Sequence, residues 1–151
     1  MEENHLTIND LILPIFVKDG MNIKEPINSM PNVHKYSLDR VTEHINEAYS
    51  LGVPAIVIFP EINPKLKTKE AHEAINPDNL ICKSIRHIVS NFPDLGIICD
   101  VALDPFNSDG HDGLLLDNYV VNDSTVEILC QQALVQAEAG CNIIAPSDMM
   151  D

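Results

Sequence analysis

The fold is decided by a ten-residue unit, LGVPAIVIFP at residues 51–60, in which a glycine ends a helical stretch and a proline closes a short apolar run. The same scheme recurs at a nearly constant spacing, as LGIICDV at residues 95–101 and AGCNIIAP at residues 139–146. A further apolar run, LILPIFV, occupies residues 11–17. These runs are short, rich in β-branched residues and not alternating, which is typical of parallel strands buried on both faces.

Helical periodicity fills the segments between the runs. Apolar residues share one helical face in each segment, and Ser37 and Gly52 are expected to begin and end the first helix. The third helix is expected to open at Asp123 or at a capping box from Ser124 to Glu127 and to end at Gly140. A second capping box predicts a short helix before the first strand. The three apolar stripes are Leu38, Val41, Ile45 and Ala48; Ile81, Ile85, Ile88 and Phe92; and Val126, Leu129, Ala133 and Ala137, and the second box runs from Thr7 to Asp10.

The predicted order is therefore β-α-β-α-β-α-β in a parallel α/β sheet with right-handed crossovers. Strands are expected at residues 11–17, 55–59, 97–101 and 142–145, and helices at residues 38–51, 80–92 and 124–139. An open doubly wound sheet and part of a (β/α)8 TIM barrel both fit, but no G-x-G-x-x-G or P-loop follows a strand. Four strands make half of a barrel, so residues 1–151 are expected to form a single partial domain, truncated after its fourth strand, with both sheet edges unpaired.

Composition excludes several classes of function. The chain has 23 acidic and 9 basic residues and a net charge of −14, which argues against a nucleic-acid partner. No apolar run is long enough to span a membrane, and the acidic N-terminus lacks the features of a signal peptide. We therefore expect a cytoplasmic protein.

Polar residues follow two of the predicted strands. Asp100 ends the third apolar run, and Asp104 and the loop NSDGHDG (residues 107–113), which contains Asp112, come next. Carboxylates at the carboxyl end of a parallel strand suit a hard cation or proton transfer. A solvated turn, with a structural hydrogen bond at Asp100, is the competing interpretation. Ser147 and Asp148 follow the fourth run, where they would also suit the N-cap of a further helix.

The other titratable residues favour structural roles. The histidines outside the loop show no ligand spacing, and the four cysteines are expected to be buried free thiols rather than a zinc site. All seven lysines are predicted to lie in loops or helices, solvated and protonated. None is expected at the end of an apolar strand, where desolvation would lower its pKa enough for Schiff-base chemistry. The lysines are Lys18, Lys24, Lys35, Lys65, Lys67, Lys69 and Lys83, and the cysteines are Cys82, Cys99, Cys130 and Cys141.

A set of short motifs covers nearly the whole chain. The motifs are DVALDPF (100–106), GHDG (110–113), YVVND (119–123), and AEAG (137–140) running on to APSDMMD (145–151), together with LPIFV (13–17), EPI (25–27), SMP (29–31) and NPD (76–78). Taken together, they resemble the porphobilinogen synthase (5-aminolevulinate dehydratase) family.

The resemblance implies an α/β-barrel enzyme that condenses two molecules of 5-aminolevulinate into porphobilinogen for haem and other tetrapyrroles. Asp100 and Ser147 match family residues that contact the lysine-bound substrate. The zinc-dependent branch has cysteines at the positions of Ala102, Asp104 and Asp112, so this chain resembles the aspartate-type branch, associated with magnesium. We expect weak Mg²⁺ binding at most, with Asp104 and Asp112 as ligands, and no tight zinc.

The same resemblance sets an expectation for activity and assembly. The family's two Schiff-base lysines lie in the second half of the barrel, beyond this sequence, so the isolated chain should make no porphobilinogen. The family forms a homo-octamer through an N-terminal arm that is mostly missing here, which leaves that assembly in doubt. A separately encoded second barrel half is one possible partner. The alternative is a non-catalytic fragment that binds a cation or pairs with an intact synthase; an aldolase-type Schiff-base barrel is disfavoured by the motifs.

Overall fold

A computed structural model describes residues 4–150 and shows one mainly parallel sheet. Residues 1–3 and Asp151, used above in the arguments on the N-terminus and the last motif, lie outside the described residues. The strand order is β2-β3-β1-β4-β5-β8. The four predicted strands are confirmed as parallel neighbours, each within one or two residues of its expected bounds. They are β1 (Ile12–Lys18), β4 (Ala55–Glu61), β5 (Gly96–Val101) and β8 (Ile143–Pro146).

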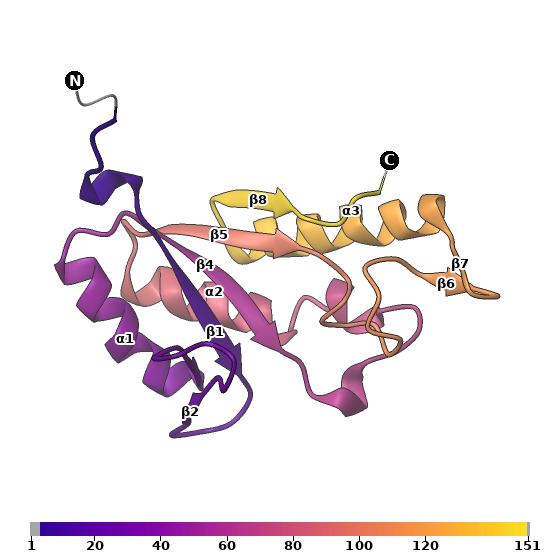
Figure 1. The fold of residues 1–151 in the computed structure, drawn as a ribbon, viewed down its shortest axis with the longest axis horizontal. Coiled ribbons are helices and arrows are strands. Elements are labelled where there is room, and N and C mark those ends of the chain that lie inside the picture. Colours follow the sequence, from indigo (N-terminus) through magenta and orange to yellow (C-terminus); the bar gives the residue numbers. More distant parts are fainter. Residues whose placement is uncertain (1–3, 151) are drawn as a thin grey trace.

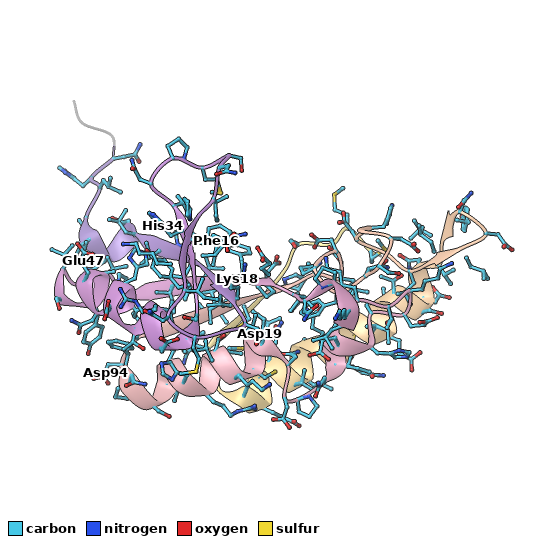
Figure 2. All side chains as sticks on the ribbon, turned by 90° about the horizontal axis from the view of Figure 1, so that it is seen from below. Phe16, Lys18, Asp19, His34, Glu47 and Asp94 are labelled. Atoms are coloured by element: carbon cyan, nitrogen blue, oxygen red, sulfur yellow. The ribbon has the colours of Figure 1, made fainter. Side chains whose placement is uncertain are left out.

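Three helices connect these strands and lie along one face of the sheet (Figures 1 and 2). They are α1 (Leu38–Ser50), α2 (Leu80–Asn91) and α3 (Asn122–Ala139). Successive strands in the chain are also neighbours in the sheet, and successive helices contact one another. This winding in a single direction is that of a barrel segment, because a doubly wound sheet reverses its strand order and places helices on both faces.

The core lies between the sheet and the helices. Along β1 and β4, alternate residues Ile15, Val17, Ile56 and Ile58 are almost completely buried. Each such side chain contributes about 1.5–3 kcal/mol of hydrophobic stabilisation. The residues between them face the other side of the sheet, where the rings of Phe16 and Phe59 stack at 5.4 Å. The apolar runs therefore serve two environments, which is why their sequences do not alternate between apolar and polar.

The expected helix ends are mostly confirmed. Gly52 and Gly140 adopt φ values of 89° and 110° just beyond α1 and at the end of α3, a conformation that side chains with a Cβ disfavour. Ser37 is the N-cap of α1, although its hydroxyl accepts from the Ile23 N–H rather than from the helix. The short 3-10 helix η1 (Ile8–Asp10) follows Thr7, whose N–H donates to the Asp10 carboxylate. Two further 3-10 helices, η2 (Pro64–Leu66) and η3 (His72–Ile75), lie between β4 and α2.

The predicted start of α3 is wrong, and its predicted apolar face is only partly right, with Leu129 buried and Ala133 packed against the core as expected. The helix begins at Asn122, two residues earlier than expected, and its N-cap is Val121 rather than Asp123 or a Ser124 capping box. Ala137 of the expected stripe is exposed, whereas Gln132 and Gln136 are buried. Apolar residues occur around most of this helix, so periodicity could not identify its buried face.

The sheet edge next to β1 also differs from expectation. A hairpin of β2 (Lys24–Pro26) and β3 (His34–Tyr36) covers it, with β3 parallel to β1 from Phe16 onward. Pro14 lies before this pairing begins, where β1 needs no N–H for a second neighbour. A second small hairpin, β6 (Leu115–Leu116) and β7 (Tyr119–Val120), lies in the loop before α3. None of the helices within residues 4–150 is long and apolar enough to cross a membrane.

Candidate functional site

Two predicted site residues meet at the carboxyl ends of β5 and β8. The Ser147 hydroxyl donates a hydrogen bond of 2.7 Å to Oδ1 of Asp100. The two residues are 47 positions apart in sequence, and the parallel pairing of Asp100 with Ala145 brings them together. Ser147 is exposed and Asp100 is partly buried, so the pair is accessible from solvent on the sheet face opposite the helices.

Three further carboxylates lie beside this pair. One oxygen from each of Asp104, Asp112 and Asp148 lies within 4.8 Å of the other two, close enough for a single cation to bind all three. Burial, followed by the charges of Asp112 and Asp100, raises the pKa of Asp104, and nearby Lys67 lowers it in part. Burial also raises the pKa of Asp148 to about 6, with the neighbouring carboxylates adding to the effect. The three carboxylates therefore repel one another when they are ionised. Their oxygen atoms are the kind of ligand that a hard cation prefers.

Hydrogen bonds hold Asp148 and the loop that contains Asp112. The Leu103 N–H donates to Asp148 Oδ2 at 2.9 Å, which ties the end of β5 to the residues after β8. The fully buried Asn107 side chain donates to the carbonyls of Lys69 and Gly113, so the loop containing Asp112 is held from inside. A Cβ at Gly113 would approach Val120 to 2.7 Å, which explains the glycine there.

Two buried glutamines support the same strand end from α3. Gln136 Nε2 donates to the Asp100 carbonyl at 3.0 Å, and Gln132 Nε2 donates to the Ala102 carbonyl at 3.1 Å. Both side chains are 1–2% exposed. Sequence pattern does not single out these glutamines, because amides on an apolar helix give no periodic signal. Nor does it give Asp148 a metal role, although the position of this residue after β8 puts it at the edge of the sheet where Asp104 and Asp112 lie.

A second charged group lies at the ends of β1 and β4 and corrects the lysine prediction. Lys18 is the last residue of β1, and Lys35 lies in β3, so neither is in a loop or helix. Each ammonium group contacts both Glu25 and Glu61. Lys18 Nζ lies 2.7 Å from Glu25 and 2.9 Å from Glu61, and Lys35 Nζ lies 3.1 Å from Glu25 and also pairs with Glu61. We call these four residues the charge ring.

Hydrogen bonds to the two glutamates raise the pKa values of both lysines despite their partial burial. Their ammonium groups are therefore protonated, as expected, but for a different reason: ion pairing rather than solvation. A strand-end amine that forms imines would need the opposite shift. Lys24 also lies in a strand, β2, with its ammonium 5.9 Å from the Tyr36 ring centre.

A cavity of about 390 Å³ separates the charge ring from the carboxylates. Lys35, Glu61 and Ile27 lie on one side, and Lys67, Asp104 and Pro105 line the rest with the apolar residues Phe16, Pro60 and Ile62. Lys67 thus lines this cavity and is only partly exposed, whereas all seven lysines were expected to be solvated. A larger cavity, about 650 Å³, lies between loops near Asp109 and Asp117, away from the strand ends. We place the candidate site at the smaller cavity because Asp104, one of the three clustered carboxylates, lines it.

The cysteine prediction is only partly right. Cys82 and Cys99 are buried, and burial raises the pKa of the Cys82 thiol to about 11. Cys130 is exposed on α3 and Cys141 is partly buried, so these two are not core thiols. The described histidines behave as expected of structural residues; His44 stacks on Tyr36 at 5.0 Å, and His87 bonds Thr42 at 2.8 Å.

Comparison with known proteins decides the family. The family model described as delta-aminolevulinic acid dehydratase matches residues 1–151. This chain belongs to the delta-aminolevulinic acid dehydratase family. The dehydratase of Bradyrhizobium diazoefficiens is 53% identical over the whole chain, which covers 43% of that protein, and the Chlamydia pneumoniae dehydratase is 45% identical, with 46% of it covered.

A crystal structure of the dehydratase (porphobilinogen synthase) from Toxoplasma gondii ME49, in complex with the reaction product porphobilinogen, superposes with a TM-score of 0.97 at 41% identity. The alignment covers 99% of this chain and 43% of that one. The expected fold class, part of a TIM barrel, is therefore confirmed. The chain spans less than half the length of these dehydratase relatives.

Proposed function

We propose that this chain forms the N-terminal half of a porphobilinogen synthase active site and is inactive alone. Its role is to supply Asp100 and Ser147 for substrate contact, while the amines that form imines with 5-aminolevulinate come from a second barrel half. The observation that carries this proposal is the hydrogen-bonded Asp100–Ser147 pair on the open face of the sheet. Membership of the family supports it, because both residues fall within the matched region.

The geometry suggests how the pair acts. The Ser147 hydroxyl gives its proton to a hydrogen bond with Asp100, which leaves the serine oxygen free to accept a hydrogen bond from the substrate. Asp100 is suited to accept a proton from, or hold positive charge on, a nitrogen placed above the strand end. Gln136 keeps the backbone of Asp100 in position from the helix side.

A magnesium ion is the cation that suits the neighbouring carboxylates. Asp104, Asp112 and Asp148 supply only oxygen ligands, which Mg²⁺ prefers and zinc in cysteine-rich sites does not. The raised pKa values of Asp104 and Asp148 support the proposal, because a cation would relieve the repulsion among these groups. When bound, the ion would supply positive charge near the strand end.

The lysines at the strand ends bear on whether the chain can act alone. Lys18 and Lys35 are held protonated by the charge ring, because hydrogen bonds to the glutamates raise their pKa values. Imine formation needs a neutral amine in a desolvated pocket, so neither of these two is suited to it.

The test is borohydride trapping with 5-aminolevulinate, followed by mass spectrometry and a porphobilinogen assay. The isolated chain should give neither a specific lysine adduct nor product. Both should appear when a chain carrying residues equivalent to the second half of the Bradyrhizobium dehydratase is added, with the adduct on that added chain. A specific adduct on a lysine of the isolated chain, with product formed, would show the proposal to be wrong.

A non-catalytic, cation-binding role is the second candidate, and the cluster of Asp104, Asp112 and Asp148 favours it. The same reconstitution separates the two. If the second half restores no activity although the two chains associate, and the isolated chain still binds Mg²⁺, the non-catalytic role is the better account.

A further inference from the structure

We propose that the charge ring is an electrostatic latch that holds the tip of the β2–β3 hairpin, residues 24–34, as an openable wall of the strand-end cavity. This inference goes beyond the proposed function and does not depend on it. Three features of the hairpin support it: its sparse main-chain pairing, the arrangement of the four charges, and its place beside the cavity.

Main-chain pairing alone holds the hairpin weakly. β3 pairs with β1 only at Phe16 with Lys35 and at Val17 with Tyr36, whereas β1 and β4 pair along their whole lengths. β2 pairs only with β3 and lies at the edge of the sheet. The segment is therefore expected to open more readily than the strands of the core.

The base of the hairpin is fixed to α1, so only its tip can move when the latch opens. Tyr36 is 6% exposed and stacks on His44 of α1. On the other arm, the Ile23 N–H donates to Ser37 Oγ and the Asn22 N–H donates to the Asp39 carboxylate. These contacts tie both arms to the start of α1, and the residues between them can move about that base.

The four charges connect the tip to the two central strands. Glu25 and Lys35 are opposite one another in the hairpin, and Lys18 and Glu61 are opposite one another in β1 and β4. The two ion pairs that join these couples are Lys18 with Glu25 and Lys35 with Glu61. Because both joining contacts are ionic, weakening the charges releases the tip without breaking the main-chain ladder between β1 and β4.

Opening would change access to the cavity. Ile27 and Lys35 of the hairpin form one side of it, and Asp104 and Pro105 lie on another. With the tip displaced, the cavity loses that side and its apolar floor of Phe16 and Pro60 meets solvent. The latch is therefore positioned to control the access of solutes to the cluster of Asp104, Asp112 and Asp148 from the side of β1.

Hydrogen exchange of the full chain, read by mass spectrometry, tests the latch without any ligand. Exchange in residues 24–34 should become about tenfold faster in Lys35→Met and in Glu61→Gln, and exchange in β4 and β5 should be unchanged. Arg86→Met is the matched control, because it removes an exposed ion pair with Asp78 that lies at α2 rather than at the hairpin. Because the two substitutions share the Lys35–Glu61 contact, their combined effect in the double variant should be smaller than the product of the two single effects.

A salt series on the natural sequence tests the latch without any substitution that could impair folding. Raising the salt concentration toward 1 M, where the Debye length falls to about 3 Å, should speed exchange in residues 24–34 of the natural sequence more than in the double variant, which keeps only the Lys18–Glu25 pair. Exchange there that is insensitive to salt, or no faster in Lys35→Met and Glu61→Gln than in Arg86→Met, would overturn the proposal. If a variant speeds exchange throughout the chain, the salt series on the natural sequence decides alone.

Discussion

The two groups of charges at the carboxyl ends of the strands differ in whether their charges are balanced. At β1 and β4, two lysines and two glutamates contact one another in a closed ring, and every pKa shift favours the charged form. At β5 and β8, four aspartates gather with Lys67 as the cation that offsets their charge in part. The pKa values of Asp104 and Asp148 are raised, which favours their neutral carboxyl forms.

This difference separates a group that is complete in itself from one that is suited to bind something else. A balanced ring is satisfied by its own contacts and gains little from a ligand. A cluster of like charges at a strand end destabilises the folded chain until a cation or a proton joins it, and such strained groups concentrate at functional sites. The contrast therefore locates the candidate chemistry at β5 and β8 rather than at the lysine-bearing end.

The largest expected effect is on catalysis in the assembled enzyme. With a second barrel half present, Asp100→Ala should lower kcat by about 10²–10⁴-fold, the range for a group that handles a proton. Ser147→Ala should cost about tenfold or more, because it removes a hydrogen bond to a charged group. Glu25→Gln, in the charge ring, should change the rate less than about fivefold, as expected of an exposed ion pair. Steady-state porphobilinogen formation measures the effect of all three substitutions. Equal losses in Glu25→Gln and Asp100→Ala would contradict the assignment of the chemistry to the ends of β5 and β8.

A smaller effect is expected on cation binding by the isolated chain. Calorimetry should detect Mg²⁺ or Mn²⁺ with dissociation constants of about 10⁻⁴–10⁻³ M, weak as for a site with few fixed ligands. Asp104→Asn, Asp112→Asn and Asp148→Asn should each weaken binding about tenfold, and Glu61→Gln should leave it unchanged. Stoichiometric zinc that survives dialysis and is lost in Asp104→Ala or Asp112→Ala would instead reverse the assignment to the aspartate-type branch.

The smallest effect is on stability, and its sign differs between the two groups. Asp148 has a raised pKa of about 6, so its folded form binds the proton more tightly than the unfolded form. Its contribution is present below the unfolded value near pH 4 and is lost as the pH rises toward 6. The pKa values of Glu25 and Glu61 are lowered, so the ring stabilises the chain above about pH 4 and loses that contribution as the pH falls further.

Thermal melts across this range measure both contributions. Asp148→Asn should remove a decline of about 1 kcal/mol, or ~2–4 °C in Tm, between pH 4 and 6, once solvent screening of a partly exposed group is allowed for. Glu61→Gln should leave that decline in place and flatten the profile only below pH 4. A decline that persists unchanged in Asp148→Asn would assign it to another group.

The repeated apolar runs, three of the four preceded by a glycine, determined the fold, because strand and helix formation at this scale depends on local pattern. The four parallel strands, three helices and the ends at Gly52 and Gly140 all follow from residues close together in the chain. The family motifs around Asp100 and Ser147 are local too, and the two residues lie at the ends of the strands that the sequence predicts for them. The β2–β3 and β6–β7 hairpins were missed, since strands of two or three residues leave no periodic signal.

Only the tertiary structure decided which side chains meet. Asp148 joins Asp104 and Asp112 because parallel pairing of β5 with β8 brings their ends together, a contact across 44 or fewer residues that no local pattern encodes. The pairing of Lys18 and Lys35 with Glu25 and Glu61 depends on the hairpin folding back onto β1. The sequence set the types of charge, but their balance at one end of the sheet and excess at the other depend on distances of a few ångströms, because electrostatic energy falls with separation and depends on burial.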